Sequence, residues 1–164
     1  MAQLSSEILT RAIKRAQNLS LTDKESACDE IFREQPNLLA SVLVQQQMGN
    51  TLEEVDVLLN ILIVLHLAVK VAGVRIGVIS ELQQEDHLAK LTASVIFSEG
   101  MDSHLVNSSI KQYISNHKEP IMLAYVTDTM KDAGFFENMK KCSKYLVLAG
   151  VNLVNCIANA TELA

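Results

Sequence analysis

The sequence predicts an all-α fold, because helix-breaking residues are few, aromatic residues are few, and apolar residues recur at helical spacing. The 164 residues include only two Pro and six Gly, too few to separate the many short strands of a β fold. Aromatic residues make up 4%, so Leu, Val, Ile and Ala must fill the core, which suits helix packing. We expect one domain, residues 1–164, folded as a compact bundle of about six to seven helices.

The first two helices are predicted from periodicity and from a capping pattern. Residues 4–19 carry apolar side chains on one face, with Lys and Arg opposite. Thr22, with Glu25 three residues later, has the pattern of a capping box. A short second helix is therefore expected from Thr22 to about residue 34.

Pro36 breaks that helix and suits the first turn of the next, over residues 36–48. The most hydrophobic helix is expected over residues 51–72, because Thr51 and Glu54 form a second capping-box pattern. Residues 74–79 are apolar, and three interpretations stay open for them: a buried turn, a short strand or a continued helix.

The second part of the chain shows similar start signals. Ser80 with Gln83, Asp102 and Pro120 are all residues that favour helix starts. The remaining helices are expected over residues 80–100, 102–116, 120–133 and 137–160.

A short internal similarity raises the question of a duplication. The stretch PNLLASV from Pro36 resembles PIMLAYV from Pro120, 84 residues later, with Pro, Leu, Ala and Val identical. Each stretch follows a polar amphipathic helix and precedes a glycine and a long apolar helix. If the halves, about residues 1–79 and 80–164, are duplicates, we expect a pseudo-two-fold with their long apolar helices packed centrally. Chance similarity of one short window is the alternative.

Charge and hydropathy exclude some classes of partner. The formal net charge is −5 and no run of Lys or Arg exceeds two residues, which disfavours nucleic-acid binding. Residues 55–79 are the nearest approach to a membrane span, but polar and charged side chains interrupt them repeatedly. We expect no membrane insertion.

The three cysteines, Cys28, Cys142 and Cys156, are odd in number and far apart, with no C-x-x-C pair. This spacing disfavours both a disulfide framework and a zinc site. The N-terminal residues also lack the basic and apolar regions of a signal peptide. We therefore expect reduced, mostly buried thiols and a cytoplasmic location.

The helix over residues 51–72 has large apolar residues on the face that should meet solvent. At 100° per residue, polar and charged side chains share that face with Ile63 and Leu67. The helix is therefore either the centre of the bundle or the surface of a homodimer or partner complex. The candidate interface residues are Asp56, Ile63, Leu67 and Lys70.

The last helix carries Asn152, Asn155 and Asn159 at helical spacing. They form either a polar seam that hydrogen-bonds to another element or an exposed polar face. Asn60 and His66 of the helix over residues 51–72 could join Asn152 and Asn155 in a pocket between the two long helices.

No pattern in the sequence indicates a metal site, a cofactor or a catalytic centre. The histidines show none of the spacings that place two metal ligands on one helical face. The chain also has no G-x-S-x-G motif and no glycine-rich phosphate loop. The four histidines are His66, His87, His104 and His117.

The leading expectation is a non-enzymatic helical interaction or regulatory protein that self-associates or binds a protein partner. It rests on the apolar face of residues 51–72 and on the lack of catalytic motifs. The alternative is an enzyme or small-ligand binder with a pocket between residues 51–72 and 137–160.

Overall fold

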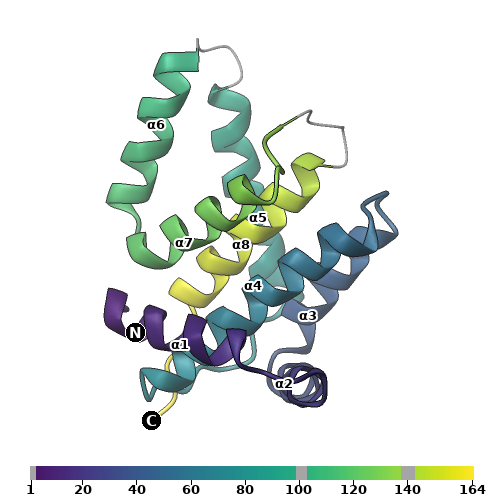
Figure 1. The fold of residues 1–164 in the computed structure, drawn as a ribbon. Coiled ribbons are helices and arrows are strands. Elements are labelled where there is room, and N and C mark those ends of the chain that lie inside the picture. The colour runs from purple at the N-terminus through teal and green to yellow at the C-terminus, as the bar shows by residue number, and fades with distance from the viewer. Residues whose placement is uncertain (1–2, 99–102, 138–142) are drawn as a thin grey trace.

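The computed structural model describes residues 3–98, 103–137 and 143–164 of the chain. These residues form eight α-helices and one short 3-10 helix (Figure 1), so the all-α prediction is confirmed. Eight helical segments were predicted individually and each contains a helix, so the stated total of about six to seven was too low. The helices are α1 (Ser6–Gln17), α2 (Leu21–Glu34), α3 (Pro36–Leu43), η1 (Val44–Gln46), α4 (Leu52–Val71), α5 (Glu81–Ser98), α6 (Ser103–Asn116), α7 (Pro120–Asp132) and α8 (Ser143–Ala158).

Two capping boxes form, one predicted at Thr51 and one at Ser80, where the sequence predicted a helix start. At α4, the Thr51 hydroxyl accepts a hydrogen bond from the Glu54 N–H, and the Glu54 carboxylate accepts one from the Thr51 N–H. Ser80 and Gln83 exchange the same pair of hydrogen bonds at the start of α5. Each box satisfies two backbone N–H groups that the helix itself leaves free.

One predicted helix start was wrong. The N-cap of α2 is Ser20, whose hydroxyl accepts from the Asp23 N–H, and Thr22 lies inside the first turn. Glu137 lies in a bend and α8 is described from Ser143 onward, so the predicted start of the last helix borders residues 138–142, which lie outside the described residues. Three residues used in the sequence predictions lie outside the described residues: Gly100, Asp102 and Cys142.

The two prolines occupy equivalent places at the starts of α3 and α7. The residue before each is the N-cap, with similar backbone angles: φ −139° and ψ 62° at Gln35, φ −125° and ψ 69° at Glu119. Both side chains are polar and buried, with 5% and 2% exposed. A buried polar side chain needs a partner, and each of these two finds one in the segment that leads into α5 or α1.

The reciprocal partners are the residues just before α1 and α5. The Gln35 side chain accepts a hydrogen bond from the Ile79 N–H (3.0 Å), two residues before α5 begins. The Glu119 carboxylate accepts one from the Leu4 N–H (3.0 Å), two residues before α1 begins. Gln35 therefore holds the chain just before α5, and Glu119 holds the chain just before α1.

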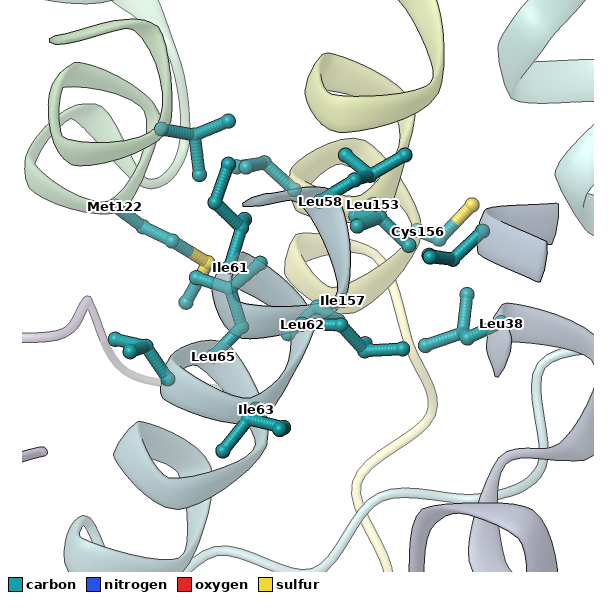
Figure 2. Packing of buried hydrophobic residues seen from close by; sticks show 14 of the residues in the cluster. Leu38, Leu58, Ile61, Leu62, Ile63, Leu65, Met122, Leu153, Cys156 and Ile157 are labelled. Carbon is teal, nitrogen blue, oxygen red and sulfur yellow. The ribbon is translucent and has the colours of Figure 1, made fainter. Parts of the chain in front are cut away.

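Helix α4 is the centre of the core. It packs against α1, α2, α3, α7 and α8, so apolar side chains around most of its circumference are covered. Complete burial of one such aliphatic side chain stabilises the fold by roughly 1.5–3 kcal/mol. Figure 2 shows core residues from α3, α4, α7 and α8 meeting around it: Leu38, Leu58, Ile61, Leu62, Leu65, Met122, Leu153 and Ile157.

Residues 74–79 form an extended segment paired with the C-terminal tail. The Gly77 N–H donates to the Thr161 carbonyl (2.8 Å), and the Leu163 N–H donates to the Arg75 carbonyl (2.8 Å). These bonds enclose an isolated antiparallel bridge and satisfy backbone groups outside the helices. Of the three interpretations left open for this segment, the strand-like one is nearest, although no full strand forms within the described residues.

Candidate functional site

The four interface candidates of α4 are divided between core and surface. Ile63 is 2% exposed within the single chain, and Leu67 is half-buried against the core. Asp56 and Lys70 are exposed. The apolar part of this face is thus mainly covered by the chain's own helices. Of the two interpretations of this helix, the one that placed it at the centre of the bundle agrees with the structure.

The four pocket candidates have different surroundings. The Asn60 amide donates to the Asp56 carboxylate (3.3 Å) on its own helix. The Asn152 amide donates to the Gln84 carbonyl in α5 (3.2 Å), whereas His66 faces α2. Of Asn60, His66, Asn152 and Asn155, only His66 lines the cavity described below.

The amides of α8 form a polar seam with α6. Asn152 and Asn155 are each 9% exposed, so the exposed-face interpretation is wrong for these two. The Asn155 side-chain oxygen lies 2.6 Å from His117 Nε2, and its amide nitrogen donates to the Tyr113 hydroxyl (3.4 Å). The hydrogen bonds of these two amides therefore join α8 to α5, to α6 and to His117, which follows α6, within one chain.

A more unusual group joins α2 to α4, and we call Glu30, Glu34, His66 and Lys70 the carboxylate–histidine cluster. The two glutamates are four residues apart on α2, and the other two residues are four apart on α4. Each pair therefore lies on one face of its helix. His66 Nε2 is 3.5 Å from Glu30 Oε2 and 3.9 Å from Glu34 Oε2, while Lys70 Nζ forms an ion pair with Glu30 Oε1.

His66 is buried without a hydrogen-bond partner for Nε2. Its side chain is 9% exposed, and Nε2 makes no hydrogen bond within the described part of the chain, since 3.5 Å exceeds an ordinary hydrogen-bond length. Burial lowers the pKa of His66, although Glu30 and Glu34 oppose that shift. The Lys70 ammonium lowers the pKa of Glu30. The cluster therefore presents a neutral imidazole beside carboxylates near pH 7.

These side chains are the types that bind divalent transition-metal ions. One ligand atom from each of Glu30, Glu34 and His66 lies within 4.8 Å of the others. The sequence predicted no metal site because spacing tests look for ligands on one helix, whereas these come from two. The available signal was a Glu pair at i, i+4 and a lone His on an apolar helix.

A cavity of about 300 Å³ adjoins the cluster. The extended segment closes one side, where the Gln35 amide donates to the Gly77 carbonyl (2.8 Å). Leu163 of the paired tail and His66 of the cluster also line the cavity. Its apolar lining includes Ile31, Leu38, Leu62, Val69 and Ile157.

The charged lining of the cavity is mostly positive. Arg33, Lys70 and Arg75 line it together with one carboxylate, Glu34. Among the described residues, neither guanidinium has a salt bridge or a hydrogen bond, so both are available to a ligand. This local excess of positive charge occurs in a chain whose formal net charge is −5.

The described thiols are poor nucleophiles. Cys28 and Cys156 are free, and burial raises the pKa of both, that of Cys156 to about 12. A thiol reacts as the thiolate, so neither is activated near pH 7.

Within the described ranges, none of the helices combines the length and the apolar character needed to cross a membrane. The chain was compared with protein families, with curated proteins and with solved structures, and none of the three comparisons gives a match.

Proposed function

We propose that this chain is a small-ligand-binding protein whose cavity takes an anion with a short apolar tail. The observation that carries the proposal is the cavity itself, which combines an apolar lining with the unpaired guanidinium groups of Arg33 and Arg75. Ligand pockets commonly measure about 300–1,000 Å³ and combine apolar walls with a few polar groups. Guanidinium groups favour carboxylates and phosphates, because they offer several N–H donors and a permanent charge.

Hexanoate and hexanol make a matched pair of probes, because they share a tail and differ in charge. We expect hexanoate to bind with saturation and Arg75→Ala to weaken that binding about tenfold, since a hydrogen bond to a charged group contributes about 1.5–3 kcal/mol. Isothermal titration calorimetry measures the hexanoate affinity of the wild type and of Arg75→Ala. Hexanol should bind the wild type and Arg75→Ala equally.

Arg11→Ala is the control for this experiment, because Arg11 is exposed on α1 and does not line the cavity. It should bind hexanoate as the wild type does. Equal hexanoate affinity in the wild type and Arg75→Ala, or no saturable binding, would contradict the proposal.

Self-association is a second candidate function, and a different surface favours it. Four large apolar side chains are exposed within ten residues where the chain passes from α3 to α4. They are Leu43 (50%), Val44 (40%), Met48 (39%) and Leu52 (67%). Exposed apolar side chains are often part of interaction sites, so we propose this corner, rather than the covered face of α4, as a homodimer contact.

Leu52→Asp should weaken dimerisation at least about tenfold, because it places a charge in an apolar contact. It should leave the fold intact, since Leu52 is exposed. Light scattering over a wide concentration range measures the mass. Leu21→Asp, at a residue 76% exposed on α2, is the control and should leave the mass unchanged. A wild type that is monomeric at every concentration would exclude this candidate.

We also infer that the chain arose by duplication, with halves at about residues 1–79 and 80–164. Equivalent helices pack in the same pairs: α1 with α4, α2 with α3 and α3 with α4 in the first half, and α5 with α8, α6 with α7 and α7 with α8 in the second. The reciprocal bonds of Gln35 and Glu119 support the same inference, because a chance match between the two sequence windows would not produce them.

A further inference from the structure

His66 Nε2 is a buried nitrogen beside the cavity that has no hydrogen-bond partner among the described residues. Its side chain is 9% exposed, and Nε2 points between two carboxylates without an ordinary hydrogen bond to either. A buried polar atom without a partner costs about 1–3 kcal/mol, so an arrangement that supplies a partner is favoured.

We propose that Glu30, Glu34 and His66 bind a divalent first-row transition-metal ion, with Zn²⁺ as the probe. Two ligands bound at about 2.1 Å to one ion lie about 3.0–3.4 Å apart, depending on the coordination geometry. The two Nε2–carboxylate separations, 3.5 and 3.9 Å, exceed that range by at most about half an ångström. The ligand oxygens of the two glutamates lie within 4.8 Å of each other, so the side-chain rotations that bring all three ligand atoms onto one ion must also close that gap.

The protonation state of the cluster suits metal binding. A ligating imidazole must be neutral and a ligating carboxylate ionised. His66 is held neutral by its burial, whereas Lys70 stabilises the ionised form of Glu30. Lys70 contacts Glu30 Oε1, so Oε2, the oxygen that faces His66, stays available. The ammonium then acts as an outer partner that orients the carboxylate.

Three protein ligands leave at least one coordination position open. Zn²⁺ sites with three protein ligands usually bind water or another small ligand in the open position. Glu34 and His66 also line the cavity, so that position adjoins it. Metal binding goes beyond the proposed anion binding and does not depend on it, so the test uses metal alone.

The test is calorimetric titration of the chelator-treated full chain with Zn²⁺. We expect one saturable site, and both His66→Gln and Glu34→Gln to weaken it at least about tenfold. Zn²⁺ should also raise the melting temperature of the wild type, because it binds the folded form. Glu34 has a side chain that is 55% exposed, so Glu34→Gln tests the site without disturbing the core.

His87→Gln and Glu85→Gln are the matched controls. These two residues also place a histidine beside carboxylates, but on α5 and outside the cluster. They should leave Zn²⁺ affinity unchanged. The proposal is overturned if no saturable binding occurs, or if Glu34→Gln binds Zn²⁺ as tightly as the wild type. Hexanoate titration without metal tests the anion proposal separately, so failure of either one is recognised on its own.

Discussion

Replacing Gln35 with Leu should lower the free energy of unfolding by about 2–5 kcal/mol, because one buried and one partly buried backbone group lose their partners. The Gln35 amide donates to the Gly77 carbonyl (2.8 Å) and its oxygen accepts from the Ile79 N–H (3.0 Å). Leu has a similar volume but no polar atom, so it fills the space and restores neither bond. Urea denaturation followed by circular dichroism measures the loss.

Gln17→Leu is the control, since Gln17 is exposed at the end of α1. It should change stability by less than about 0.5 kcal/mol. The stability of Gln35→Glu should lie between those of Gln35→Leu and Gln17→Leu. Its carboxylate can still accept a hydrogen bond from the Ile79 N–H but cannot donate one to the Gly77 carbonyl. If Gln35→Leu is as stable as Gln17→Leu, the extended segment does not depend on this side chain.

Gly150→Ala should destabilise the chain by about 1–3 kcal/mol, although alanine is the better helix former by about 1 kcal/mol. A Cβ at Gly150 would lie 2.6 Å from Met130 Sδ and 3.5 Å from Leu58 Cδ1. Met130 is fully buried, so its side chain cannot simply swing into solvent. The close approach of α7 to α8 therefore outweighs the gain in helix propensity. Thermal or urea denaturation shows whether Gly150→Ala is less stable than the wild type.

The effect of Gly150→Ala on stability should reverse when Met130 is replaced by a shorter residue. In a Met130→Ala background the Cβ has room, so Gly150→Ala should stabilise by up to about 1 kcal/mol. Met130→Ala by itself should cost about 2–5 kcal/mol, because it leaves a cavity. A Gly150→Ala variant that is more stable than the wild type would mean that α7 and α8 are not in close contact.

Helix positions were predictable to the extent that local chemistry sets them. The capping pairs at Thr51 and Ser80 and the prolines act within one turn, and their effect is visible in the sequence. The start of α2 was predicted wrongly because Ser20 and Thr22 both carry a hydroxyl able to cap. Local pattern alone does not decide between two such neighbours.

The candidate site was not predictable, because it depends on how two helices are rotated and aligned. Glu30 meets His66 only because α2 packs on α4 in one register. The burial of Asn152 and Asn155 likewise depends on contacts of α8 with α5 and α6. The periodicity of one helix does not show which helix packs beside it or in which register. From the sequence alone, such residues are recognisable only as polar residues whose partners are unknown.

The bonds of Gln35 and Glu119 tie the starts of two helices to residues far away in the sequence. The bond from the Leu4 N–H to Glu119 joins residues 115 positions apart, so it can form only after the chain as far as the start of α7 has been placed. The bond from the Ile79 N–H to Gln35 holds the entry to α5 in the same way. Loss of Glu119 would thus release the segment before α1 and loss of Gln35 the segment before α5, while the packing of α1 on α4 and of α5 on α8 would remain.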